Sequence, residues 1–244
     1  MGEDQSGETV LAVLEGDPLY RAPRLTGEKV TLDEARLLAP VIPRSKVIGA
    51  GRNYAEHAAE LGNAVPSEPL LFFKPNTSVI GPGEPIMLPR QSTDVNYEAE
   101  LAVVIGRVCK DVPAERVSDV IFGYTCANDV TARDLQKTDG QWARAKGFDT
   151  FCPLGPWIET DLDPSDLAIR CTVGDEIRQD GRTSQMISDV TALVTYISAA
   201  FTLLPGDVIL TGTPAGVGQI GAGDEIHVTI EDIGTLSNRA VTPD

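Results

Sequence analysis

The stretch NYEAELAVVIG, residues 96–106, decides which kind of fold this chain can adopt. Its Leu101, Val103 and Ile105 point to one side of an extended strand, and the residues between them are equally apolar. A strand that is apolar on both faces is typical of the interior of a sheet that is covered on both sides. The stretch therefore predicts a buried strand in a sizeable core, which a chain of 244 residues can form.

Similar short apolar runs continue along the chain on both sides of this strand. They are rich in Val, Ile, Leu and Phe and are separated by Gly, Pro and Asp, as is typical of strands joined by turns. One clear helix is predicted over 188–201, where apolar residues recur at helical spacing after a capping Ser188 or Asp189. The fold class is therefore mainly β (α+β). The predicted strands are LLFFKP (70–75), PIMLP (85–89), ELAVVIG (100–106), DVIFGYTCAND (119–129), LAIRCTVGDEIR (167–178), DVILTG (207–212) and DEIHVTIEDIG (224–234).

The beginning of the chain has a different pattern. The run VLAVLEGDPLYR (10–21) predicts a strand, a Gly-Asp-Pro turn and a second strand, and TLDEARLLAP (31–40) predicts a helix. The pattern changes at PRSKVIGAGRNY (43–54), where a strand ends in glycines. We therefore predict a small N-terminal segment, 1–45, and a main domain, 46–244.

Composition excludes several classes of function. The formal net charge of −16 argues against a nucleic-acid binder, which must neutralise phosphates with Lys and Arg. The charge favours solubility, or it reflects acids gathered around a cation. The four cysteines form no CxxC pair, which argues against a zinc cluster. No apolar run is long enough to span a membrane, and the acidic N-terminus is unlike a signal peptide, so we expect a cytoplasmic protein.

Three acids form the first candidate site. Glu98 and Glu100 are two residues apart, so they share one face of the predicted strand, and Asp129 stands where the strand 119–129 ends. The alternatives are a solvated strand face for the pair and a helix N-cap for Asp129. Because the strand is apolar on both faces, buried carboxylates there need a cation, and oxygen ligands suit Mg²⁺, Mn²⁺ or Ca²⁺. Nearby Lys146 is either part of this site or a surface lysine.

Two glycine motifs resemble phosphate-binding loops. GVGQIG (216–221) matches G-x-G-x-x-G, but it leads into a strand pattern and not into a helix, which the dinucleotide site requires. GTPAGVG (212–218) lacks the Gly-Lys-Ser/Thr ending of a phosphate loop. We interpret both as turns. Glycines can let the backbone approach a ligand closely, so Thr213 stays a minor site candidate.

One of the two histidines lies in GRNYAEHAAELG (51–62), three residues before an acid. On a helix His57 and Glu60 share a face, and a carboxylate there can orient the imidazole and raise its basicity. The alternative is a solvated surface pair. The flanking glycines suit a segment that can order and disorder. The other histidine, His227, alternates with apolar residues on a predicted strand and is expected to be exposed.

The motifs together resemble the fumarylacetoacetate hydrolase family. They occur in the family's order over roughly residues 45–240, and although each alone is unspecific, the combination is highly specific. The N-terminal 45 residues resemble the leading segment of the shorter family members. The matching stretches are IGAGRNYAEHAAELG, LLFFKPNTSVIGPGEPI, DVNYEAELAVVIGR, GYTCANDVTARDLQ, RAKGFDTFCPLGPWI, RQDGRTSQMI and PGDVILTGTPAGVG.

The resemblance implies a fold and a set of site residues. The fold is a mixed β-sandwich roll, of the type of this family's C-terminal domain, in a homodimer. It holds Mg²⁺ or Mn²⁺, with Ca²⁺ as a substitute. The metal-ligand positions are Glu98, Glu100 and Asp129; the acid–base dyad, on a lid over the substrate, is His57 and Glu60; the active-site lysine is Lys146; the substrate-side positions are Lys74, Arg133 and Gln136.

The resemblance implies several reactions on one small keto-acid substrate class. The first is metal-dependent hydrolysis of a C–C bond in acylpyruvates (1,3-dioxo acids), through a metal-stabilised enolate. The alternatives are isomerisation of 2-hydroxyhepta-2,4-diene-1,7-dioate and decarboxylation of oxaloacetate in the same site. A remote alternative is a non-catalytic metal-binding β domain, in which a base on a mobile lid would have no use.

Overall fold

The chain divides into two compact units, Met1–Leu37 and Leu38–Asp244. The computed structural model describes residues 1–3, 7–62 and 64–243. The sequence placed the corresponding boundary at residue 45. None of the helices in these described residues combines the length and the apolarity needed to cross a membrane.

The N-terminal unit is a small three-stranded sheet in the order β1-β2-β3. The strand predicted at the start of 10–21 is correct, but the second one is wrong, because the chain turns there and the next strand begins only at Leu25. The helix predicted over 31–40 is also wrong. Only a 3₁₀ turn forms, Thr31 Oγ1 bonds the Glu34 carboxylate at 2.8 Å, and Leu38 is exposed, so no packed face stabilises a short helix. The strands are β1 (Gly2–Glu3), β2 (Thr9–Leu14) and β3 (Leu25–Thr31).

A seven-stranded sheet forms the centre of the larger unit, in the order β5-β4-β15-β9-β10-β12-β6. Its middle strand, β9 (Ala99–Ile105), is buried at all seven residues, which confirms the prediction from its two apolar faces. The other strands are β4 (Val47–Gly51), β5 (Leu70–Lys74), β6 (Val79–Ile80), β10 (Ile121–Asn128), β12 (Cys152–Glu159) and β15 (Val208–Leu210).

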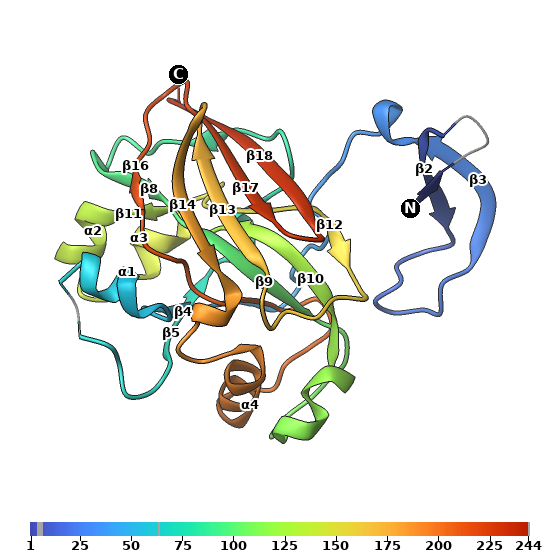
Figure 1. The fold of residues 1–244 in the computed structure, drawn as a ribbon, viewed down its shortest axis with the longest axis horizontal. Helices are drawn as coiled ribbons and strands as arrows, with labels where there is room; N and C mark the ends of the chain where they lie inside the picture. Colours follow the sequence, from blue (N-terminus) through green and yellow to red (C-terminus); the bar gives the residue numbers. More distant parts are fainter. Residues whose placement is uncertain (4–6, 63, 244) are drawn as a thin grey trace. The chain divides into compact units, whose positions relative to one another are not determined.

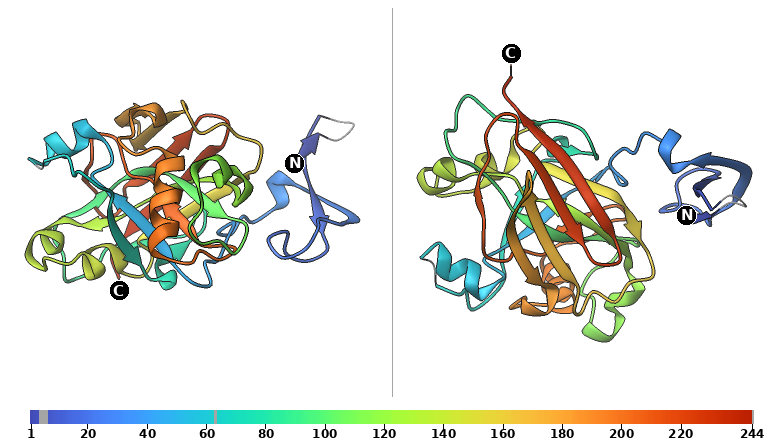
Figure 2. Two further views of the ribbon diagram at one scale, coloured as in Figure 1. Left: turned by 90° about the horizontal axis from the view of Figure 1, so that it is seen from below. Right: turned by 45° about the horizontal axis from the view of Figure 1, so that its top comes forward.

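A second, five-stranded sheet lies over the first, in the order β14-β13-β17-β18-β7 (Figure 1). The predicted helix is confirmed as α4 (Val190–Ala200), with Asp189 as its cap, and it packs against the strands of the central sheet (Figure 2). The mainly β class is therefore confirmed. The strands of the second sheet are β7 (Ile86–Met87), β13 (Ala168–Val173), β14 (Glu176–Arg182), β17 (Glu225–Ile230) and β18 (Gly234–Val241).

Short elements beside one end of β9 carry half of the predicted site residues, namely His57, Glu60, Arg133, Gln136 and Lys146. A small sheet in the order β11-β8-β16 adjoins three short helices. The glycines of the two phosphate-loop lookalikes lie in turns and in β16, and not at the start of a helix, as the sequence indicated. These elements are β8 (Val95–Tyr97), β11 (Thr131–Ala132), β16 (Gly218–Gln219), α1 (Ala55–Glu60), α2 (Arg133–Thr138) and α3 (Ala143–Gly147).

Two glycines of β4 make room for aromatic rings beside the site. A Cβ at Gly49 would lie 2.1 Å from the Phe72 ring, and one at Gly51 would lie 2.6 Å from Trp142. Alternate residues of a strand share a face, so both rings pack against the same glycine face of β4. The ring centroids of Phe72 and Trp142 are 5.6 Å apart in an edge-on arrangement. The sequence suggested that Gly51 gives the following segment its mobility. The structure shows that Gly51 is also required for the packing of Trp142.

Candidate active site

The pairing of β9 with β10 brings the three predicted acids together. Ala99 pairs with Asn128, so the residues one step beyond the pair, Glu98 and Asp129, become neighbours. The backbone N–H of Asp129 donates to the carbonyl of Glu98 at 2.9 Å, and the N–H of Glu98 donates to Oδ1 of Asn128 at 3.0 Å. With Glu100 they offer carboxylate oxygens that lie within 4.8 Å of one another, all from buried residues.

This donor set fits a hard divalent cation. Burial raises the pKa of Glu100 well above its usual value, and the neighbouring charges of Asp129 and Glu98 raise it further. The N–H of Gly212 donates to Glu100 Oε2 at 2.6 Å, which stabilises the charged form but does not offset the other effects. Three buried carboxylates repel one another, and a cation held between their oxygens would offset that repulsion.

Three buried cations surround the acids. Lys146, at the end of α3, donates to Glu98 Oε2 at 2.9 Å and to Asp129 Oδ2 at 2.5 Å. Lys74, at the end of β5, pairs with Asp129, and Arg133, at the start of α2, donates from Nη2 to Glu98 Oε1 at 2.5 Å. All three side chains are buried, so Lys146 is not a surface lysine.

These ion pairs set the protonation states. Burial alone would raise the pKa of Glu98, but Lys146, Arg133 and His57 together outweigh it, so its pKa lies far below the usual value. Burial alone would lower the pKa of Lys146, but Asp129 and Glu98 outweigh it and its pKa is raised. At neutral pH the site therefore holds an ionised Glu98 beside a protonated Lys146.

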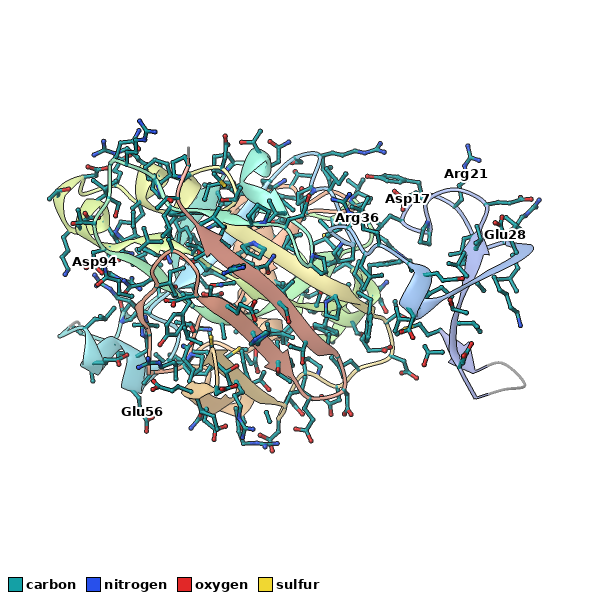
Figure 3. The ribbon with its side chains drawn as sticks, turned by 90° about the horizontal axis from the view of Figure 1, so that it is seen from above. Asp17, Arg21, Glu28, Arg36, Glu56 and Asp94 are labelled. Carbon is teal, nitrogen blue, oxygen red and sulfur yellow. The ribbon has the colours of Figure 1, made fainter. Side chains whose placement is uncertain are left out.

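His57 and Glu60 lie on the inner side of α1, the short helix after β4. Glu56, the neighbouring acid, points outward into solvent (Figure 3). Nδ1 of His57 is 3.6 Å from Oε2 of Glu60, and His57 is buried, whereas the Glu60 side chain is about one-third exposed at 35 %. The pair is therefore not a solvated surface pair. Nδ1 of His57 has no hydrogen-bond partner among the described groups.

The environment of His57 favours its neutral form. Burial is the largest effect and lowers its pKa; Glu98 raises it, and Arg133 and Lys146 lower it again. The carboxylate of Glu60 accepts the backbone N–H of Gly216 at 3.1 and 3.2 Å to its two oxygens, which holds α1 against the loop before β16. A buried neutral imidazole next to a carboxylate is suited to accept a proton.

One cavity of about 300 Å³ joins the α1 segment to Glu98, one of the three acids. His57, Glu98, Arg133, Gln136 and Lys146 all line it. Nη1 of Arg133 donates to Oε1 of Gln136 at 2.8 Å, so α2 presents two of the predicted substrate-side groups as a unit. The volume is that of a small-molecule site.

Of the predicted substrate-side residues, Lys74 and Thr213 do not line the cavity. Thr213 is buried beside β9, where its hydroxyl donates to the Ala99 carbonyl at 2.8 Å and accepts from Gln179 Nε2 at 2.7 Å. It holds the strand that carries Glu100. His227 was expected to be exposed but is half-buried, and its Nδ1 is bonded to Ser237 Oγ at 2.8 Å across the β17–β18 pair.

The sequence missed some residues that complete the cavity. Arg52, Leu61, Lys137 and Trp142 line it as well. Arg52 has a left-handed backbone, with φ at 57°, which a sequence does not reveal. Lys137 and Trp142 lie near predicted site residues, but only the folded arrangement of α2 and α3 turns them toward the cavity.

Comparisons with family models and with curated proteins give matches over most of the chain. The family model described as fumarylacetoacetate (FAA) hydrolase C-terminal matches residues 46–241, and one described as Rv2993c-like, N-terminal, matches residues 5–40. Protein Rv2993c of Mycobacterium tuberculosis is 56 % identical over 91 % of this chain and 84 % of its own length. The mitochondrial oxaloacetate tautomerase Fahd2a of Rattus norvegicus is 41 % identical over 97 % of this chain and 78 % of its own.

Solved structures have the same fold. The 2-hydroxyhepta-2,4-diene-1,7-dioate isomerase of Mycobacterium marinum aligns with a TM-score of 0.90 and 52 % identity over 99 % of this chain and 92 % of its own. Fumarylpyruvate hydrolase of Pseudomonas aeruginosa, solved in complex with Mn²⁺ and pyruvate, aligns with a TM-score of 0.78 and 35 % identity over 83 % of this chain and 91 % of its own. The predicted family fold is therefore confirmed.

Proposed function

The chain belongs to the fumarylacetoacetate hydrolase family, and we propose that it is a Mg²⁺- or Mn²⁺-dependent hydrolase that cleaves a C–C bond of acylpyruvates. The family includes hydrolases, isomerases and tautomerases that act on small keto or hydroxy acids. The observation that carries the choice of hydrolysis is the placement of a buried, neutral His57 on the same cavity as Glu98 and Lys146.

The residues of the site divide the reaction between them. Glu98, Glu100 and Asp129 would hold the metal, which when bound supplies Lewis-acid stabilisation of negative charge on a keto-acid oxygen. Lys146 keeps its positive charge beside Glu98 and Asp129, where it can stabilise the negative charge that develops on the substrate. Arg133 and Gln136 supply donors that orient the substrate on the cavity wall.

His57 is the proposed general base. Its Nδ1 faces Glu60, so Nε2 takes a proton from water, and the hydroxide bonds to the distal carbonyl carbon of the 1,3-dioxo acid. The bond from that carbon to the methylene carbon breaks, and its electron pair passes into the pyruvate enolate. The proton then returns to the enolate carbon. The products are pyruvate and a carboxylic acid.

The same groups suit a second reaction type. Enolisation of oxaloacetate, isomerisation of a hydroxydienedioate and decarboxylation of oxaloacetate all pass through a stabilised enolate and need no activated water. The similarity to an oxaloacetate tautomerase and to a hydroxyheptadienedioate isomerase favours this candidate. In it His57 would move a proton on the substrate itself. A non-catalytic metal domain would have no use for His57 on the cavity or for buried Lys146.

A substrate panel tests the proposal. Purified protein with Mg²⁺ or Mn²⁺, with and without a chelator, is given acetylpyruvate, fumarylpyruvate, oxaloacetate and a hydroxydienedioate. Metal-dependent release of pyruvate from the acylpyruvates supports hydrolysis. Turnover of oxaloacetate or of the dienedioate alone would replace hydrolysis by the second reaction type.

A further inference from the structure

Arg52 occupies a strained backbone position on the wall of the active-site cavity. Its φ of 57° lies in the left-handed region, which costs energy for a residue other than glycine. The next residue holds it there: the Asn53 side chain donates to the carbonyls of Ser188 and Thr211 at 2.8 and 2.7 Å and accepts the N–H of Ser188 at 2.8 Å. A costly conformation that its neighbour fixes this firmly suggests that the side chain at this position has a use.

The side chain is held in place as well. The guanidinium carbon of Arg52 lies 5.8 Å from the centroid of the Trp142 ring, within the range of a cation–π contact. Trp142 is itself packed on Gly51 and against Phe72. Arg52 as a residue is half-buried, and the contact with the Trp142 ring positions its guanidinium before any ligand arrives, which lowers the entropy that binding would cost.

Within the described ranges, the charge of Arg52 is not neutralised by an ion pair. The deeper cations, Lys74, Lys146 and Arg133, are each paired with Glu98 or Asp129. Arg52 has no carboxylate at ion-pair distance in the part of the chain that the structure describes. Lys137, also on the cavity, is exposed, so solvent and salt screen its charge more strongly. Arg52 thus gives the cavity a preorganised guanidinium that no carboxylate among the described residues neutralises.

We propose that Arg52 binds the second carboxylate of a dicarboxylic keto acid and so sets a preference for dicarboxylic over monocarboxylic substrates. The inference rests on the proposed function insofar as the keto-acid end of the substrate lies at the acid cluster. A guanidinium matches a carboxylate with two parallel hydrogen bonds, which makes the preference specific. The substrate class is then keto acids with a carboxylate at each end.

Binding of a matched, unreactive pair tests this assignment. 2-Oxoglutarate and 2-oxopentanoate have the same chain length and keto-acid end, and only the first has a distal carboxylate. Their dissociation constants are measured by calorimetry with the Mg²⁺-loaded protein. The wild type should prefer 2-oxoglutarate. Arg52→Gly and Arg52→Asn, both residue types that tolerate a positive φ, should reduce that preference on the order of 10- to 100-fold.

The control removes a charge nearby. Arg144 on α3 is exposed and paired with Asp139 at 2.6 Å, so Arg144→Gln should keep the wild-type preference. A wild type without preference, or Arg52 variants that keep it, would overturn the assignment. If the Arg52 variants lose the preference but the wild type cleaves no acylpyruvate, the assignment stands and the proposed reaction fails. If the wild type cleaves acylpyruvates and the preference is independent of Arg52, the reaction stands and the assignment fails.

Discussion

Nδ1 of His57 lies 3.6 Å from Oε2 of Glu60, just beyond a hydrogen bond, while both oxygens of Glu60 accept the N–H of Gly216. Glu60 therefore has two functions in the structure: it faces the imidazole and it attaches α1 to the loop before β16. A small shift of the carboxylate would complete the dyad without detaching α1. The dyad is carried by α1, whereas the metal acids lie at the ends of β9 and β10, and the predictions below use this separation.

The loss of His57 should separate two activities. His57→Ala removes the proposed water activator, so acylpyruvate hydrolysis should fall on the order of 10²- to 10⁴-fold. Decarboxylation of oxaloacetate needs no activated water and should survive much better, although loss of the side chain from the cavity can reduce it somewhat. Lys146→Ala should reduce both activities. Steady-state turnover of acylpyruvate and of oxaloacetate, with the bound metal quantified in each variant, checks this prediction. An equal loss of the two activities in His57→Ala would show that His57 is not a dedicated water activator.

The pH dependence of hydrolysis should report the lowered pKa of His57. Burial is the main cause of the lowering, so the neutral base exists at pH values below the ordinary pKa of 6.5. The acidic limb of kcat/KM should then rise with pH and reach its half-point below 6.5. Because the charge of Glu60 raises this pKa, Glu60→Gln should move the half-point further down. A limb centred above 6.5 would contradict the assignment.

Two ligand substitutions should both remove the metal but differ in stability. Glu98→Ala should abolish metal binding and activity and leave buried Arg133 and Lys146 without their partner, at a cost of about 3–5 kcal/mol. Glu100→Ala should also lose the metal. The metal-free variant should nevertheless keep most of the stability of the metal-free wild type, because burial and repulsion from the other acids raise the pKa of Glu100 and make its charge unfavourable there. Elemental analysis and urea unfolding measure both effects. Retained metal stoichiometry in Glu98→Ala would disprove the site.

The packing of Phe72 on β4 should make Gly49 sensitive to a single methyl group. A Cβ would meet the ring at 2.1 Å, so Gly49→Ala should lower the free energy of unfolding by about 1–3 kcal/mol and reduce activity through the displaced aromatic wall. Gly221→Ala is the matched control, because its Cβ would meet only Asp224 Oδ2, at 3.8 Å. Equal unfolding midpoints for the two variants would show that the ring can move aside at little cost.

We also expect the protein to form a homodimer, as the family resemblance implies. Light scattering at micromolar concentration measures the molar mass directly. The dimer should have twice the 26.0 kDa of the chain. A stable monomer under these conditions would contradict the expectation.

Local patterns along the chain were sufficient for the central strand, for helix α4 and for the candidate acids. Each depends on alternation or helical spacing among near neighbours, and the burial of a strand with two apolar faces follows from the hydrophobic effect alone. The same reasoning failed for residues 31–40, because a short helical pattern forms a helix only if other parts of the fold cover its apolar face. It also missed β18, whose sequence GTLSNRAV contains few large apolar residues and becomes a strand through pairing with β17.

The sequence by itself determined that this chain would bury a β core and that Glu98, Glu100 and Asp129 could serve a cation. Only the tertiary structure decided which charges those acids meet, since Lys74, Arg133 and Lys146 arrive from β5, α2 and α3. It also decided that Glu60 meets Gly216 and that Arg52 lies on the cavity wall beside Trp142. The reason is physical: periodicity is a property of neighbours in the chain, whereas ion pairs depend on strand register and on how the backbone is held between distant segments.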